Sequence, residues 1–322
     1  MYHIFCHGIV YFRNIDLLMS HGLPRGIFVK NKEKGEIMKK FFGEVDLTWR
    51  KLIIFAVIAG VVTAVVALVH PLDFTSLHAI AETFEVWILI GIFIIMNSKS
   101  NKDSALKCFV FFLISQPLVY LIQVPFDELG FGLFTYYKYW AIWTVLCLPM
   151  GYIGYYMKKN KWWGYLILFP MIALTAYSYY SYIRLFGFCC PRYILICIFC
   201  ICAMIMYPLV VFNDKKIRRV GAAIGIVLAI GVSTLGLTNP MVYSTEIMGQ
   251  DAYNFDDTYS VQLEDESFGE ASIQDFDGYY MVHVDFKKGG DTNVILRSPK
   301  GEERVYSVHV EPYTFQVDGH IK

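Results

Sequence analysis

The sequence lacks the short motifs by which many enzymes and nucleotide-binding proteins can be identified. It contains no His-Glu-x-x-His pair, no phosphate-binding P-loop and no glycine-rich dinucleotide fingerprint. Only 17% of its 322 residues are charged, whereas 56% are hydrophobic and 17% are aromatic. This apolar share is well above that of a soluble chain. We therefore expect a membrane protein without a credible catalytic nucleophile, base or metal set.

Long hydrophobic runs, in contrast, are abundant. Crossing the hydrocarbon core of a bilayer takes about 20 apolar residues, with a range of about 17 to 25. Each crossing must be helical, because lipid offers the backbone no hydrogen-bond partner. The fold class predicted for residues 52–237 is an α-helical polytopic membrane domain of seven transmembrane helices. The predicted spans are Leu52–Val69, Leu77–Met96, Cys108–Val124, Tyr139–Tyr156, Trp162–Tyr182, Tyr193–Phe212 and Val220–Leu237.

The second predicted span is the least apolar of the seven. Its clean apolar run is Val86–Met96, so a full-length crossing has to include Glu82 and Glu85. On a continuous helix, these carboxylates would share one face with a histidine four residues before Glu82. Ionisable residues inside a membrane are functional candidates, and a proton or cation could bind here. The alternative is an interfacial segment whose carboxylates face water. The candidate intramembrane polar site comprises His78, Glu82, Glu85, Gln116 and Gln123.

Basic residues cluster on alternate sides of the predicted spans. By the positive-inside rule, the N-terminus and the loops that carry these clusters are cytoplasmic. Seven crossings then place everything after Leu237 outside the cytoplasm. We expect a multi-pass protein of the cell membrane, with the lipid bilayer as a partner and no nucleic-acid partner. The basic clusters comprise Lys39, Lys40, Arg50, Lys51, Lys99, Lys102, Lys107, Lys158, Lys159, Lys161, Lys215, Lys216, Arg218 and Arg219.

Residues 1–37 differ from the rest of the chain. Polar residues interrupt every apolar run in this segment, so it is not a secretory signal peptide. Lys34-Gly35-Glu36 can be encoded as AAAGGAGAA, which resembles a bacterial ribosome-binding site at a suitable distance before Met38. We hypothesise that translation starts at Met38, followed by a cytoplasmic N-terminus over residues 38–51. The alternative is that residues 1–37 are a genuine cytoplasmic tail.

The composition changes after Asn239-Pro240. From Met241 onward, sixteen Asp or Glu residues stand against six Lys or Arg residues, although the whole chain is neutral. Short apolar or alternating runs separated by turn residues indicate β-strands. We predict a linker over residues 238–257 and a small, acidic, all-β sandwich over residues 258–322. The predicted strands are Tyr259–Leu263, Ala271–Ile273, Tyr279–Phe286, Thr292–Leu296 and Val305–Val310.

One hairpin of this region resembles a known family. Gly289-Gly290 leads into Thr292–Leu296, and the turn Pro299-Lys300-Gly301 leads into Val305–Val310. This arrangement resembles the last hairpin of bacterial immunoglobulin-like domains, which implies a binding or spacer module rather than an enzyme. The layout of the whole chain resembles uncharacterised multi-span membrane proteins of Gram-positive bacteria, and that resemblance implies no activity.

Acidic residues of the β region offer a single candidate for a cofactor, which is calcium. Asp275-Phe276-Asp277-Gly278 has the alternating acid spacing of a calcium loop, but no bidentate Glu follows at the twelfth position that an EF-hand requires. A hairpin turn explains Asp277-Gly278 equally well. Further oxygens for a calcium site could come from Asp256, Asp257, Glu264, Asp265 and Glu266 if the fold brings them together. Apart from calcium, no cofactor is predicted.

Two patterns inside the spans indicate packing rather than chemistry. Cys197 and Cys200 have the spacing of a redox or metal pair, but no second pair accompanies them and their neighbours are apolar. We expect both thiols to behave as small buried apolar groups. Gly221 and Gly225 have the spacing that lets two membrane helices approach closely.

Two classes of function remain, and we expect the first because it better accommodates the shortage of ionisable residues inside the spans. The first is an envelope or sensory component whose helices anchor the acidic β module and present it to a cell-surface partner. The second is a transporter or channel-like protein in which the β module is an accessory. A polar cavity lined by Glu82, Glu85 or Gln116 would favour the second class.

If translation starts at Met38, mass spectrometry of the protein from its own cells will find N-terminal peptides that begin at Met38 or Lys39. The reason is that a ribosome-binding site lies upstream of the start codon and is not translated. Tryptic peptides between Asn14 and Arg25 would contradict the hypothesis.

Overall fold

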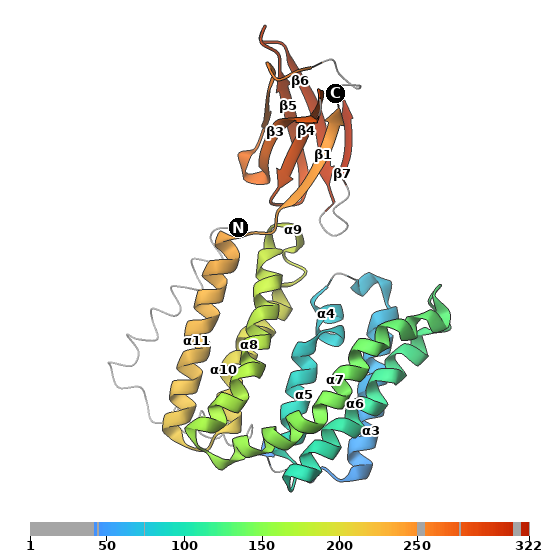
Figure 1. Cartoon of the computed structure of the whole chain (residues 1–322), viewed down its shortest axis with the longest axis vertical. Coiled ribbons are helices and arrows are strands. Elements are labelled where there is room, and N and C mark those ends of the chain that lie inside the picture. The colour runs from blue at the N-terminus through green and yellow to red at the C-terminus, as the bar shows by residue number, and fades with distance from the viewer. Residues whose placement is uncertain are drawn as a thin grey trace, which may run out of the picture.

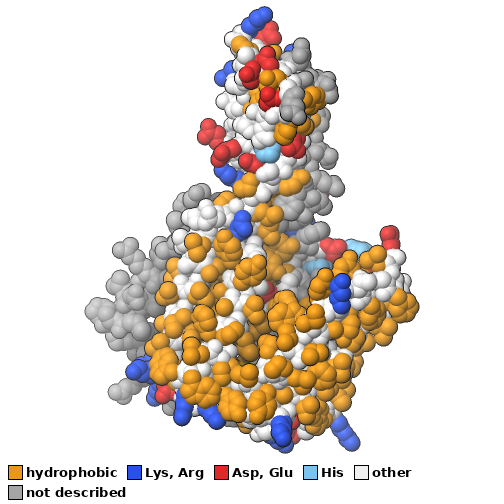
Figure 2. All heavy atoms as spheres, viewed as in Figure 1, with side chains coloured by type: hydrophobic (Ala, Val, Ile, Leu, Met, Phe, Trp, Pro, Cys, Tyr) orange, Lys and Arg blue, Asp and Glu red, His pale blue; other side chains and the backbone are white. Residues whose placement is uncertain are grey.

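A computed structural model of the chain describes residues 42–43, 45–73, 75–249, 255–276, 278–311 and 317–321. Residues 1–37 and the predicted start at Met38 lie outside these ranges. Figure 1 shows a bundle of helices with a smaller β domain mounted at one end. We call this end of the bundle the β-domain end. Lys and Arg side chains gather at the opposite end (Figure 2), which we call the lysine-rich end.

Helices make up the larger part of the described chain. Among the described residues, six helical segments are long and apolar enough to cross a membrane, namely α3, Ser76–Met96, α6, α8, α10 and α11. Hydrophobic side chains cover most of the bundle surface seen in Figure 2. These features indicate a membrane-spanning protein. The helices are α3 (Trp49–Leu68), α4 (Ser76–Glu82), α5 (Phe84–Met96), α6 (Asn101–Gln123), α7 (Phe134–Gly154), α8 (Trp162–Arg184), α9 (Phe186–Cys189), α10 (Ile194–Val211) and α11 (Lys215–Thr238), with short 3₁₀ turns at His70–Leu72, Gly130–Leu133 and Tyr155–Lys159.

The predicted span Tyr139–Tyr156 corresponds to α7, which is not among the six apolar segments. This helix has 21 residues, so its length would suffice for a crossing. Its first turns carry Lys138 and several tyrosines, and these side chains lower its mean hydropathy. Six of the seven predicted spans are therefore supported by length and composition together, and α7 by length alone.

Side-chain caps define where three of the long helices begin. Thr48 accepts a hydrogen bond from the Lys51 N–H at the start of α3, and Ser100 accepts one from the Asp103 N–H at the start of α6. Asp214 caps α11 by accepting from two backbone N–H groups, at 2.8 and 2.9 Å. Such caps satisfy N–H groups that have no partner within the helix.

The second predicted span is not one continuous helix. Thr83 separates α4 from α5, and its φ and ψ angles of −95° and 172° are extended. The Thr83 N–H still donates to the Ala79 carbonyl oxygen at 2.9 Å. The interruption places His78 in α4 and Glu85 in α5, so these two residues do not lie on one continuous helix. The side chain of Glu82 lies outside the described part of the structure.

The helices form two groups that meet at this interrupted span. The first group consists of α3, α5, α6 and α7, and the second of α8, α10 and α11 (Figure 1). Contacts between the groups run through α4, which packs on α10, and through α5, which packs on α8. The interruption between α4 and α5 therefore lies at the junction of the two groups.

Close packing within the second group requires glycine. A Cβ atom at Gly225 would lie 2.6 Å from the Met204 carbonyl oxygen, and one at Gly221 would lie 2.7 Å from the Pro208 Cβ atom. Non-bonded atoms do not approach so closely, so α11 packs on α10 only because both side chains are absent. This confirms the packing interpretation of the two glycines.

Two small antiparallel sheets form the C-terminal region. Their strand orders are β1-β4-β3 and β2-β5-β6-β7. Buried residues of both sheets belong to a single core, in which Val282, Val284, Val294 and Val310 are fully buried. The strands are β1 (Tyr243–Gly249), β2 (Ser260–Leu263), β3 (Gly269–Phe276), β4 (Tyr279–Phe286), β5 (Gly290–Arg297), β6 (Glu303–Val310) and β7 (Val317–Ile321).

Five of these strands were predicted, whereas β1 and β7 were not. β1 lies within the predicted linker 238–257, so the linker is shorter than expected. Its residues alternate in burial, and it pairs with β4 so that Tyr243 lies opposite Phe286. A polar edge strand of this kind is stabilised by its partner more than by its own apolar residues, which explains why its sequence pattern is faint.

The β domain rests on the connection between α8 and α10. Phe188 of this connection is 3% exposed and belongs to the core of the β domain. The Met241 N–H donates to the Arg184 carbonyl oxygen at 3.0 Å. In Figure 1, α9 lies directly below the β domain. The β domain is therefore packed on the second helix group rather than tethered by a free linker.

We expect Gly225→Leu to reduce the free energy of unfolding by about 1–3 kcal/mol, because the new side chain would force α11 away from α10. Thermal unfolding of the full chain in detergent measures this effect. Gly231→Leu, in the same helix, is the control, because a Cβ atom at Gly231 meets no atom within 4 Å. Equal losses in the two variants would contradict the proposed helix contact.

Candidate functional site

Glu85 is the most unusual polar residue in the helical bundle. It lies in the first turn of α5, directly after the interruption at Thr83, and it is only 1% exposed. The Thr83 hydroxyl donates a hydrogen bond to its Oε2 atom. Its Oε1 atom is buried without a hydrogen-bond partner. Because an unpaired buried polar atom costs free energy, folded proteins contain few of them.

Neutral polar side chains of the second helix group lie near this carboxyl. Tyr182 of α8 hydrogen-bonds Thr83 and lies within electrostatic range of Glu85. Cys200 and Tyr207 of α10 are also near enough to Glu85 to interact with it electrostatically. None of the ion pairs formed by the described residues includes Glu85. In the described part of the chain, the carboxyl therefore lies near hydroxyl and thiol groups at the junction of the two helix groups, without a positive side chain to balance it.

Two events would satisfy the unpaired oxygen of Glu85. A proton would convert the carboxylate into a neutral group that can donate a hydrogen bond. A cation would be held by carboxylate and hydroxyl oxygens and would supply the missing positive charge. The geometry therefore leaves one carboxylate oxygen of Glu85 available to a proton or a cation.

Gln116 and Gln123 line a separate pocket. Together with Thr63 and Trp87 they border a space of about 500 Å³, a volume that includes the open space at its mouth. Gln116 is 2% exposed, and its Nε2 atom has no hydrogen-bond partner. Glu85 does not border this space. Thr63, Gln116 and Gln123 contribute polar groups to its lining beside apolar side chains, and the buried carboxyl is not part of it.

His78 lies in α4, on the other side of the interruption. Its Nε2 atom is 3.6 Å from one carboxylate oxygen of Asp73, and the Nδ1 atom of His70 is 3.4 Å from the other. These three residues form a polar cluster of their own at the β-domain end of the bundle. The predicted site residues are thus divided among three places, apart from Glu82, whose side chain is not described.

For Glu85, the alternative in which the carboxylate faces water is wrong, because α8 and α10 cover it. Sequence reasoning missed Thr83, Tyr182 and Tyr207. Their hydroxyl groups are visible in the sequence as polar atoms in apolar spans, but only the packing of three helices brings them to one carboxyl. The prediction that Cys197 and Cys200 are buried is confirmed, since both lie in the bundle core.

The acidic residues proposed as calcium ligands make local hydrogen bonds. Asp275 accepts from the Gly278 N–H at 2.7 Å, and Asp265 accepts from the Ser267 N–H at 2.9 Å. Hydrogen bonds from Ser267 hold the pKa of Asp265 below its usual value. Asp277 lies outside the described residues, and within the described ones no three His, Cys, Asp or Glu side chains are grouped as a metal ion would require. The observed bonds are typical of turns, and calcium binding stays a prediction.

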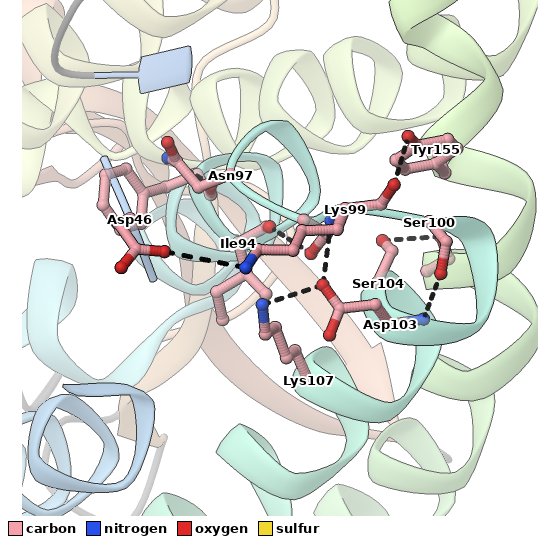
Figure 3. A network of polar contacts seen from close by, with 12 residues as sticks. Asp46, Ile94, Asn97, Lys99, Ser100, Asp103, Ser104, Lys107 and Tyr155 are labelled. Atoms are coloured by element: carbon pink, nitrogen blue, oxygen red, sulfur yellow. Dashed lines mark hydrogen bonds and ion pairs between the residues drawn. The ribbon is translucent and has the colours of Figure 1, made fainter. Parts of the chain in front are cut away.

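A buried ion pair stabilises the lysine-rich end of the bundle (Figure 3). The Lys107 Nζ atom is 2.8 Å from the Asp103 Oδ2 atom, and Lys107 is 2% exposed. The Lys99 N–H donates to the same oxygen at 2.8 Å. Nearby, the Lys158 ammonium donates to the Ser98 carbonyl oxygen at 2.8 Å, and burial lowers the pKa of Lys158. Some of the basic residues from which the topology was predicted therefore also hold the turn between α5 and α6 in place.

Comparisons with protein-family models, with curated proteins and with solved structures gave no match. The function of the protein must therefore be inferred from the geometry of these sites.

We expect Lys107→Ala to lower the free energy of unfolding by about 3 kcal/mol, because the Asp103 carboxylate would remain partly buried without its partner. Thermal unfolding in detergent at neutral pH measures the loss. Lys102→Ala is the control, since Lys102 lies in the same helix but is exposed. Unchanged stability in the Lys107 variant would show that the ion pair does not stabilise this end of the bundle.

Proposed function

We propose that this protein is a membrane transporter or channel-like protein whose activity depends on proton or cation binding at Glu85. One observation carries this proposal: a carboxyl that is 1% exposed has an unpaired oxygen at an interruption of a helix. Ionisable residues within membrane bundles often belong to ion pathways or proton relays. Interrupted helices are likewise typical of the binding sites of transporters.

The position of Glu85 supports this function further. Its carboxyl belongs to α5, whereas Tyr182 and Tyr207, which face it, belong to the second helix group. A change of charge at Glu85 would alter the interaction between the groups, because an ionised carboxylate and a neutral acid offer different hydrogen bonds. Movement of one group against the other is how many transporters expose a site to alternate sides.

For the topology, we propose that α7 is a seventh crossing. Its 21 residues would extend about 31 Å along the helix axis, which is close to the thickness of the hydrocarbon core. With α7 counted as a crossing, the described residues of all four basic clusters lie on one side of the membrane, at the lysine-rich end of the bundle. By the positive-inside rule this end is cytoplasmic, and the β domain lies outside the cytoplasm.

For the β domain, we propose an immunoglobulin-like sandwich that binds a cell-surface or envelope partner. Apolar residues of its two sheets share one core, as in sandwich domains. Its role in a transporter would be that of an accessory domain that recognises a partner or a substrate outside the cell.

An envelope or sensory component is the second candidate function. The observation that favours it is the close contact between the β domain and the α8–α10 connection, where Phe188 enters the β core. Binding of a partner to the β domain would act directly on the connection between α8 and α10. In that case the helices would serve as an anchor or as a receiver of the signal.

A pH-jump experiment tests the role of Glu85. The full chain is reconstituted into liposomes on a solid-supported membrane, and charge displacement is recorded after rapid steps of pH, Na⁺ or K⁺. We expect a transient current in the wild-type protein, because the buried carboxyl binds the added ion. We expect Glu85→Gln to lose this current, since an amide cannot bind a proton or balance a cation.

Glu128→Gln is the matched control, because Glu128 is exposed in the α6–α7 connection. Its current should equal that of the wild-type protein. A wild-type current that persists unchanged in Glu85→Gln would refute the proposed site. The absence of any wild-type current under all three steps would instead favour the anchor or sensory function.

A further inference from the structure

An elongated apolar groove lies between α5, α6, α7 and α8, apart from the carboxyl of Glu85. Its volume is about 670 Å³, including the open space at its mouth. Aromatic and aliphatic side chains line it, with two cysteines. No Lys, Arg, Asp or Glu residue borders the groove. A ligand that occupies it must therefore be apolar.

The groove follows the helix axes. On α5 its lining residues run from Phe84 to Ile95, which corresponds to about 16 Å at 1.5 Å per residue. On α7 they run from Trp140 to Gly151. Its length is about half of the hydrocarbon core of a bilayer, or the depth of one leaflet. An extended hydrocarbon chain has this shape and this direction in a membrane.

Gly91 keeps the groove open. A Cβ atom at Gly91 would meet no atom within 4 Å, although this residue lies in the middle of α5 and borders the groove. Other glycines of the bundle allow close contact, as at Gly151, where a Cβ atom would lie 3.0 Å from Ala105. Glycine is unfavourable in the interior of a helix. Since no packing contact requires it at position 91, its effect is to leave space for a ligand.

The mouth of the groove faces lipid rather than water. Phe84, Met150 and Leu174 border it and are 37%, 38% and 39% exposed. They belong to α5, α7 and α8, and α7 and α8 share few contacts with each other. In a membrane, the molecules that surround these exposed apolar side chains are the acyl chains of lipids.

We propose that this groove binds one acyl chain of a bilayer phospholipid, which enters from the membrane between α7 and α8. The groove excludes the polar headgroup because it offers no charged partner. The chain lies along α5 and reaches the space beside Gly91. This site is independent of the proposed proton or cation site, because Glu85 is not part of its lining.

Photocrosslinking tests the proposal. The full chain is reconstituted with a phospholipid that carries a diazirine in one acyl chain, irradiated and digested, and the adducts are mapped by mass spectrometry. We expect adducts at Cys147, Met150 and Met171, which border the groove. In Gly91→Leu these adducts should decrease about tenfold, because the new side chain fills the space that the ligand needs.

Gly231→Leu is the control, because Gly231 also has free space around it but lies in α11, outside the groove. Its adducts at the groove should equal those of the wild-type protein, and both variants should unfold at similar temperatures. Unchanged adducts in Gly91→Leu would overturn the proposal. Adducts confined to α3 and α11 would overturn it as well, as would labelling of the groove by an isoprenoid or sterol diazirine but not by the phospholipid.

Discussion

Backbone hydrogen bonding in apolar surroundings is the constraint on which the rest of this structure depends. Lipid cannot bond to free N–H and C=O groups, so a helix inside a membrane can be interrupted only where other protein groups cover it. At Thr83 the interruption is covered by α8 and α10, and the Thr83 N–H keeps its bond to Ala79. The same covering helices bury Glu85. The interrupted helix, the buried carboxyl and the junction of the two helix groups are therefore consequences of one packing arrangement.

The second helix group connects this junction to the β domain. Tyr182 faces Glu85, and two residues later the Arg184 carbonyl oxygen accepts a hydrogen bond from Met241, just before β1. The Ser76 hydroxyl, at the start of α4, donates to the Arg192 carbonyl oxygen at 2.6 Å, beside the connection that carries Phe188. Short paths of packed and hydrogen-bonded groups thus join the buried carboxyl to the domain at the end of the bundle.

Much of the fold could be predicted because, for most helices and strands, the local order of apolar and polar residues is enough to identify the element. An apolar run of about 20 residues predicts a membrane-spanning helix, and the described ranges contain six such segments. Five strands were likewise evident from alternation and turn residues. β1 was not, because a polar edge strand depends on β4, more than thirty residues away, for its hydrogen bonds. The interruption at Thr83 was also missed, since an isolated threonine is common in continuous membrane helices.

The sequence by itself determined six of the predicted apolar spans, the distribution of basic residues and the acidic β region, because each depends on residues that are neighbours in the chain. It also identified Glu85 as an ionisable group inside a predicted span. Only the tertiary structure decided that Glu85 is buried with an unpaired oxygen, that Gln116 and Gln123 belong to another pocket and that Gly91 borders an apolar groove. These properties depend on which faces of separate helices meet, and that choice is made by side-chain packing among residues far apart in the sequence.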